Sequence, residues 1–309
     1  MEATANQTAV SLSLQSLIDT RHYIVKSRSD APVSGNDYPG QRTGIKRGQG
    51  MEFVDLRQYT QGDDVRHIDW NVTARSNEPY TRLYRQEKEQ TTTVVVDLRP
   101  IMFNGSHCLR SKAAARFAAA TLWQAAHTGD RCSATVIDNK GVRSCRPVSG
   151  SQGVLQSLEL IASAYNSSAN TTDKPTQTEP LLSDALELIS NKKRRSGCHI
   201  VFSGFDTHND HNFEDLLLSV AARGNTYAVL LLDKMEQTAP PGGYYRYRSN
   251  GTRSIILNKD KIRKLNTLLS KQIASRRNRL LDAGIKTLSL PTNKGITDFL
   301  ATLQQQQWV

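Results

Sequence analysis

The sequence predicts an α/β protein with a doubly wound, mostly parallel sheet and helices on both faces. After residue 90, short β-branched runs alternate with segments of helical pattern, which is typical of this fold class. The run "TTTVVVDL" is apolar throughout and ends at an acid, as expected for a buried parallel strand whose carboxyl end meets a functional loop. The run "TYAVLLL" predicts a second buried strand.

The first 90 residues have a different character. Apolar residues recur at helical spacing over residues 11–28 and predict one amphipathic helix. A loop rich in Gly, Pro, Ser and Asp follows, and residues 80–90 alternate as in an exposed or edge strand. We therefore expect an N-terminal region at 1–90 and the α/β domain at 91–309.

Beyond residue 90 the elements follow one another closely. After "TTTVVVDL" we expect the helix "SKAAARFAAATLWQAA", with Ser111 as its N-cap, and the strand "DRCSATVID". The helix "GVLQSLELIASAY" and the polar segment "NSSANTTDKPTQT" follow. We then expect the helix "LLSDALELISNKKRR", the strand "CHIVFSGF" and the helix "NFEDLLLSVAARG", which ends at Gly224. "TYAVLLL" comes next. A hairpin with Asn250-Gly251 in its turn, a long basic helix at 260–283, the strand "IKTLSL" and the helix "ITDFLATLQQQ" complete the chain.

Composition limits the possible functions. The net charge of +11 and pI near 9.6 favour an acidic partner, which could be nucleic acid, an anionic membrane face or an acidic protein. No apolar run approaches the roughly 18 residues needed to span a bilayer, and the N-terminus lacks the basic cluster of a secretory signal. The four cysteines are scattered without zinc-ligand spacing. We expect a cytoplasmic protein with reduced thiols.

Common catalytic motifs are missing from the sequence. It contains no G-x-G-x-x-G or G-x-x-x-x-G-K-[ST] pattern for nucleotide phosphates. It also contains no G-x-S-x-G nucleophile elbow and no H-E-x-x-H zinc motif. We predict a non-enzymatic protein.

A dense cluster of acids is the one feature that favours catalysis. Asp63, Asp64, His67 and Asp69 are residue types that bind metals or transfer protons. The neighbouring arginines, Arg57, Arg66 and Arg75, can neutralise three carboxylates by bidentate hydrogen bonds. Aromatic and aliphatic side chains, namely Trp70, Phe53, Ile68 and Tyr59, would bury that network. We interpret the cluster as a structural or interaction scaffold, and a metal-dependent hydrolase at these acids stays open as an alternative.

The same stretch, "RGQGMEFVDLRQYTQGDDVRHIDWNVTAR", closely resembles the signature of the DUF58 family. The matching positions are Glu52-Phe53, Arg57, Tyr59, Gly62-Asp63-Asp64, Arg66, Ile68-Asp69-Trp70 and Ala74-Arg75. The resemblance extends over roughly residues 12–305. It implies a bacterial or archaeal protein with a von Willebrand factor A-like domain. It also implies association with a MoxR-type AAA+ ATPase, as an adaptor or co-chaperone.

Domains of the von Willebrand type often carry a magnesium site that needs D-x-S-x-S after the first strand. Here Asp97 is present, but Arg99 and Ile101 occupy the serine positions. An isoleucine offers no ligand atom, and an arginine would bring a second cation to a cation site. We expect Arg99 to pair with Asp97 in place of a metal.

The remaining ligand positions of such a site are also altered. Where the resemblance implies S-D-F after the fourth strand, the chain has Ser203-Gly204-Phe205. Asp206 would need a shifted loop to replace the missing carboxylate, and Thr178 could supply the later hydroxyl. We predict a degenerate site without metal or other cofactor, kept as a docking edge for a protein partner. The leading alternative is a binder of nucleic acid or anionic membrane that uses "YYRYR" and the basic helix.

Overall fold

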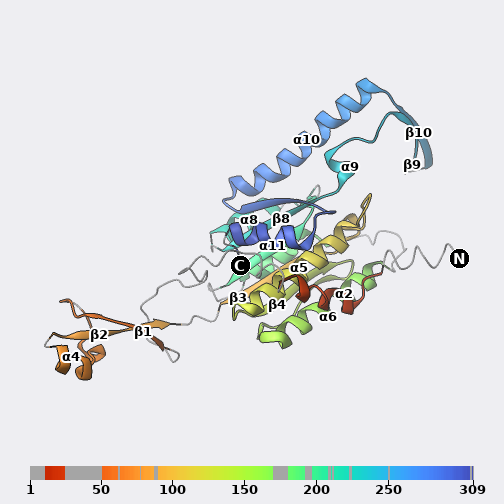
Figure 1. Cartoon of the computed structure of the whole chain (residues 1–309). Helices are drawn as coiled ribbons and strands as arrows, with labels where there is room; N and C mark the ends of the chain where they lie inside the picture. The colour runs from red at the N-terminus through yellow and green to blue at the C-terminus, as the bar shows by residue number, and fades with distance from the viewer. Residues whose placement is uncertain are drawn as a thin grey trace. The chain divides into compact units, whose positions relative to one another are not determined.

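Figure 1 shows the computed structural model of the chain. The described residues are 11–24, 51–61, 63–76, 78–86, 90–169, 180–191, 197–207, 210, 212–222, 225–249, 251–306 and 308. Several predictions concern residues outside these ranges: the end of the N-terminal helix beyond 24, the loop that follows it, most of "NSSANTTDKPTQT" with Thr178, the "KKRR" segment, Gly224 and Asn250. The backbone of Glu52 and Phe53 is described, but their side chains are not.

The chain divides into two units. One unit comprises residues 34–89, and the other comprises residues 1–33 and 90–309. The single helix expected over residues 11–28 is interrupted in the described part: α2 spans Leu14–Ile18, Asp19 and Thr20 form a turn, and residues 21–24 are helical. These residues belong to the larger unit. There Leu17 is fully buried, and Leu12 O accepts a hydrogen bond of 2.9 Å from Asn166 Nδ2.

In its described residues, the smaller unit contains two antiparallel strands and two short helical segments. Its elements are β1 (Met51–Gln58), the 3₁₀ helix η1 (Val65–His67), α4 (Trp70–Ser76) and β2 (Tyr80–Gln86). β1 and β2 pair antiparallel with an irregularity between Phe53 and Asp55, so the strand expected at 80–90 is confirmed over residues 80–86, while β1 had not been predicted. Among the side chains described in this unit, Asp69 and Thr81 are the buried ones, and both are polar.

The larger unit contains a sheet that is mostly parallel. Its strands are β3 (Thr91–Asp97), β4 (Arg131–Asp138), β5 (Gly141–Ser144), β6 (Val148–Ser149), β7 (Cys198–Ser203), β8 (Thr226–Leu232) and β11 (Lys286–Pro291). The order across the sheet is β11-β8-β7-β3-β4-β5, with β6 also paired to β4. β5 and β6 run antiparallel to β4, and the other pairings are parallel.

Helices cover both faces of this sheet, as predicted. One core contains residues of α2, α5 (Arg110–His127), α6 (Gly150–Ala169) and α11 (Ile296–Gln305). The other contains residues of α7 (Leu182–Asn191), α8 (Phe213–Ala221) and α10 (Lys259–Asp282). The valines of β3 alternate between the two cores, with Val94 and Val96 in the first and Val95 in the second.

Details of four elements differ from expectation. Helix α5 begins at Arg110 with Leu109 at its N-cap, so the prediction of Ser111 as N-cap was wrong. Ser111 lies inside the first turn and is fully buried, while Leu109 O already accepts from Ala113 N. The antiparallel pair β5 and β6 and the short helix α9 (Lys234–Gln237) had not been predicted.

The predicted hairpin is present near the C-terminus. It consists of β9 (Gly243–Ser249) and β10 (Gly251–Leu257), which pair antiparallel and lead into α10. Asn258 caps α10 by accepting a hydrogen bond of 3.0 Å from Lys261 N. Within the described part of the chain, no helix has both the length and the apolar character required to cross a bilayer.

Candidate functional site

The carboxyl ends of β3 and β7 meet at one edge of the sheet. Counted along the chain without β6, the strand order is 3-2-1-4-5-6, so the direction of winding reverses between β3 and β7. Ligands of open α/β sheets bind outside the carboxyl ends of the strands at such a reversal. Asp97 ends β3 and Ser203 ends β7. We call the loops after β3, β7 and β8 the carboxyl edge.

Asp97 is the centre of a buried ion pair at this edge. Its side chain is fully buried and accepts four hydrogen bonds. Arg99 supplies three of them, from its backbone N–H (3.1 Å), Nε (3.0 Å) and Nη2 (2.8 Å). Ser203 Oγ supplies the fourth, at 2.6 Å. The pairing of Arg99 with Asp97 expected from the sequence is therefore confirmed.

Arg99 is itself almost completely buried, with 7% of its surface exposed. Burial alone would lower the pKa of Arg99, but the negative charges of Asp97 and Asp206 outweigh it and raise that pKa. Arg99 Nη2 also lies 3.4 Å from the Asp206 backbone oxygen. The guanidinium is thus a permanent positive charge held against both oxygens of the Asp97 carboxylate.

The residues at this position do not fit a magnesium ion. Both carboxylate oxygens of Asp97 already accept from a cationic side chain, and Ile101 has no donor atom for a metal. Gly204 brings no carboxylate. In the part of the chain that the structure describes, no group of three or more His, Cys, Asp or Glu residues is arranged to hold a metal ion.

Neighbouring side chains leave no room for a residue larger than glycine at position 204. A Cβ added to Gly204 would lie 2.5 Å from Arg110 Nη1 and 2.8 Å from Asp206 Oδ2. An aspartate, which the resemblance implies at this position, would therefore have to displace Arg110. The next residue, Phe205, has a φ of 51°, and its N–H donates to Ser203 Oγ at 2.9 Å. This turn aims the Ser203 hydroxyl at Asp97 and directs the loop toward the arginines.

A second ion-pair network lies beside the first. Asp206 Oδ2 accepts from Arg110 Nη1 at 2.8 Å, and Asp206 Oδ1 lies 3.0 Å from Arg276 Nη1 in an ion pair. Glu236 Oε1 lies 3.2 Å from each of the same two arginines. Arg276 also donates to Gly204 O at 2.9 Å. Asp206 is thus held by cations of α5 and α10 and is unable to serve as a metal ligand without breaking this network.

Sequence reasoning missed Arg110, Arg276 and Glu236. The signal for Arg276 is present in the apolar stripe of α10, where Ile262, Leu269, Ile273 and Leu280 recur at helical spacing. Arg276 falls on that stripe and is 9% exposed. A cation on the apolar face of a helix requires a buried anion, and this pattern could have predicted the network.

The short helix α9, directly after β8, borders the carboxyl edge. Asp233 accepts hydrogen bonds from Ser106 N (2.9 Å) and from Met235 N (3.0 Å), which ties the loop after β3 to the start of α9. Burial would raise the pKa of Asp233, but these N–H donors together lower it. A groove of about 420 Å³ lies next to this junction, lined by Ser106, His107, Lys234, Met235, Thr238, Ala239, Pro240 and Pro241. Met235 is 51% exposed there.

The acids of the smaller unit have separate local roles. Asp63 lies 2.6 Å from Arg57 Nη2 and accepts from Thr60 N at 3.0 Å. The Thr60 N–H is the main cause of its lowered pKa. Asp64 caps η1 by accepting from Arg66 N at 3.0 Å. These contacts match a scaffold role, and the pairing of Arg57 with one of the acids is confirmed.

Asp69 begins helix α4. Its Oδ1 accepts from the N–H groups of Asn71 (3.0 Å) and Val72 (3.2 Å), as an N-cap does. Its other oxygen accepts from Arg82 Nε at 2.8 Å, and this bond is the main cause of the lowered pKa of Asp69. The partner of Asp69 is therefore Arg82 of β2.

This arrangement corrects two expectations from the sequence. Arg66 and Arg75 were expected to neutralise carboxylates through their guanidinium groups. Instead, the backbone N–H of Arg66 donates to Asp64, and the side chain of Arg82 forms the ion pair with Asp69. Trp70 was expected to bury the acids, but it is 68% exposed. Trp70 follows the capping residue on the first turn of α4, and adjacent helical positions point about 100° apart. When Asp69 faces β2, Trp70 consequently faces away.

Comparison with known proteins places this chain in a group without a known activity. The family model described as "Protein of unknown function DUF58" matches residues 55–278. Uncharacterized proteins of Mycobacterium tuberculosis and Mycobacterium bovis are 27% identical to this chain over 231 residues. The alignment covers 74% of this chain and 68% of each relative.

Proposed function

Because the chain belongs to the DUF58 family, whose function is unknown, we propose that it is a cytoplasmic, non-enzymatic protein-interaction module. Its partner would be a MoxR-type AAA+ ATPase, a client protein, or both. The proposed docking site is the carboxyl edge of a von Willebrand factor A-like sheet whose metal site is degenerate. The mostly parallel sheet with helices on both faces supports this architecture.

The observation that carries the proposal is that internal arginines occupy the carboxylates of the carboxyl edge. Arg99 binds both oxygens of Asp97, and Arg110 and Arg276 bind Asp206. A site that works through a bound cation must leave coordination positions open to its ligand. Here the chain's own side chains fill them, so the edge is rigid, charge-balanced and independent of a metal.

The exposed surface at this edge has the properties of a protein-binding site. Met235 and Ile101 are 51% and 37% exposed, and Pro240 and Pro241 line the groove beside Met235. Interface cores are enriched in methionine and depleted in charged residues, with polar groups around them. A partner would place an apolar side chain in this groove while its polar groups contact the rim.

The two alternatives receive less support. The hydrolase hypothesis needs Asp63, Asp64 and Asp69 to converge, but each acid is used in a different turn or cap. A nucleic-acid or membrane binder would use the basic residues of the C-terminal part, which lie outside the carboxyl edge. That hypothesis is a separate outcome of the experiments below.

Isothermal titration of the full chain with the MoxR-type ATPase of the same organism tests the proposal. We expect saturable binding that Met235→Asp weakens about tenfold or more, because an apolar anchor is replaced by a charge. Leu218→Asp is the matched control, since Leu218 is 54% exposed on α8, on a face of the sheet. It should leave the affinity unchanged.

Two results would contradict the proposal. The first is equal loss of affinity in both variants, or the absence of any complex with the ATPase. The second is a titration of the isolated chain with Mg²⁺ that shows tight binding, lost in Asp97→Ala. That second result would mean that the ion pair with Arg99 opens to admit a metal.

A further inference from the structure

Most of the net positive charge of this protein arises from one segment. Residues 243–282 contain eleven Lys and Arg residues but two acids, and so carry +9 of the chain's net charge of +11. The segment comprises β9, β10 and α10, with the hairpin at the N-terminal end of the helix (Figure 1). We call it the basic arm. A charge concentrated in this way marks a surface for an anionic partner.

The two halves of α10 are held differently. In the C-terminal half, Arg276 and Leu280 are buried, and Arg276 is bound to Asp206 and Glu236 at the carboxyl edge. In the first half, residues 259–272, every side chain is at least partly exposed. The helix is therefore anchored at one end and presents the other end to solvent.

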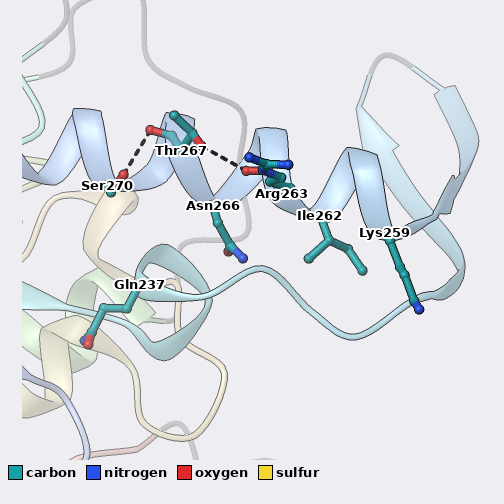
Figure 2. A pocket seen from close by; sticks show the side chains of 7 residues that line it. All are labelled: Gln237, Lys259, Ile262, Arg263, Asn266, Thr267 and Ser270. Carbon is teal, nitrogen blue, oxygen red and sulfur yellow. Dashed lines mark hydrogen bonds between the residues drawn. The ribbon is translucent and has the colours of Figure 1, made fainter.

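An open groove runs along this free half. It measures about 600 Å³ and is lined by Gln237, Lys259, Ile262, Arg263, Asn266, Thr267 and Ser270. The six lining residues of α10 follow helical spacing and so form one stripe (Figure 2). Figure 2 shows Ile262 and Asn266 directed toward the segment that links α9 with β9. Asn266 Oδ1 accepts from Ala239 N at 2.7 Å, which holds that segment against the helix.

We propose that this groove binds an acidic segment of a protein partner. Lys259 and Arg263 are exposed and would pair with its carboxylates. Ile262 offers apolar contact, and four uncharged polar residues offer hydrogen bonds. This mixture of apolar, polar and cationic groups is typical of protein interfaces.

A phosphate backbone fits the groove less well. Protein surfaces that bind nucleic acid are much more positively charged and make a series of phosphate contacts. Here two of the seven lining residues are cations. Three apolar side chains of the arm, Tyr244, Ile256 and Leu268, are each about 60% exposed and also favour a protein partner over a polyphosphate.

The helix provides a matched pair of control positions. Lys264 and Lys271 are exposed on the same helix and lie outside the stripe that lines the groove. The double variants Lys259→Glu/Arg263→Glu and Lys264→Glu/Lys271→Glu change the net charge equally. Both change exposed residues, and circular dichroism melting should confirm that both variants fold.

The test is fluorescence anisotropy with a short labelled peptide in which glutamates alternate with leucines. We expect binding that the groove pair weakens about tenfold or more and the control pair changes less than about threefold. Polyglutamate, which lacks apolar side chains, should bind more weakly than the leucine-containing peptide. Duplex DNA, single-stranded RNA and phosphatidylserine vesicles are tested in parallel.

Equal losses in the two double variants would overturn the inference, because the arm would then act as a diffuse polycation. Tighter binding of DNA, RNA or vesicles than of the peptide would also overturn it. This inference goes beyond the proposed function, because the groove lies on the basic arm and the peptide test does not involve the ATPase. Its failure would leave the proposal for the carboxyl edge intact.

Discussion

Arg99→Met tests whether the buried ion pair stabilises the carboxyl edge. Methionine keeps most of the side-chain volume but removes two hydrogen bonds to the Asp97 carboxylate, at 3.0 and 2.8 Å. Asp97 would remain fully buried with two donors, the residue 99 backbone N–H and Ser203 Oγ. Removal of one partner of a buried pair costs about 3–5 kcal/mol. The two retained donors place the expected loss near about 3 kcal/mol.

Differential scanning calorimetry gives the corresponding shift in melting temperature. For domains of roughly 150–250 residues, 1 kcal/mol corresponds to about 2–4 °C, so we expect Tm to fall by about 6–12 °C. Urea denaturation should report the same loss in the free energy of unfolding. A change in Tm of less than about 1 °C would refute the inferred role of Arg99 in the buried pair.

The double variant Asp97→Asn/Arg99→Met separates a lost ion pair from a packing defect. It leaves no uncompensated buried charge, so its loss should be smaller than the sum of the losses in Asp97→Asn and Arg99→Met. Strictly additive losses would show that the two side chains do not interact energetically.

Three further predictions follow from other sites. Gly204→Ala should lower the free energy of unfolding by about 1–3 kcal/mol in urea denaturation, because its Cβ would lie 2.5 Å from Arg110 Nη1; unchanged stability would mean that the arginine moves freely. Burial raises the pKa of Asp130 in the fold, so its contribution to stability is full below the unfolded pKa of about 3.9 and is lost as pH rises through the folded pKa. Asp130→Asn should therefore raise Tm at neutral pH but not in acid, and a gain independent of pH would contradict this cause. The hydrogen bond from Arg82 lowers the pKa of Asp69, so the stability it confers is present above about pH 3.9 and is lost as pH falls through the folded pKa. Asp69→Asn keeps the capping oxygen but removes the charge that faces Arg82, so it should accelerate hydrogen exchange in β1 and β2 at neutral pH, relative to the unmodified chain, and equal rates would count against the ion pair.

Much of the larger unit could be predicted because its strands are encoded locally. β3 and β8 are continuous runs of apolar and β-branched residues, and such runs identify buried strands without tertiary information. β5 and β6 escaped prediction because four and two residues are too few for a periodic pattern. Their conformation depends on the hydrogen bonds offered by the edge of β4.

The candidate site was predictable where its partners are close in sequence. Arg99 lies two residues from Asp97, so their pairing could be inferred from the loop alone. Arg276 lies 72 residues from Gly204, and this contact depends on how α10 packs against the sheet. Trp70 was expected to be buried, but it is 68% exposed beside the capping residue Asp69, so its neighbours in sequence did not reveal its exposure. Distance along the chain therefore decided which ion pairs the sequence revealed.

Hydrogen exchange of the full chain with and without a MoxR-type ATPase tests docking at the carboxyl edge. We expect protection of the loops after β3 and β8, at residues 98–109 and 233–242, in the complex. We also expect Met235→Asp to remove this protection and Leu218→Asp to retain it. Protection confined to the smaller unit at residues 51–86, or exchange that the ATPase leaves unchanged, would contradict docking at the carboxyl edge.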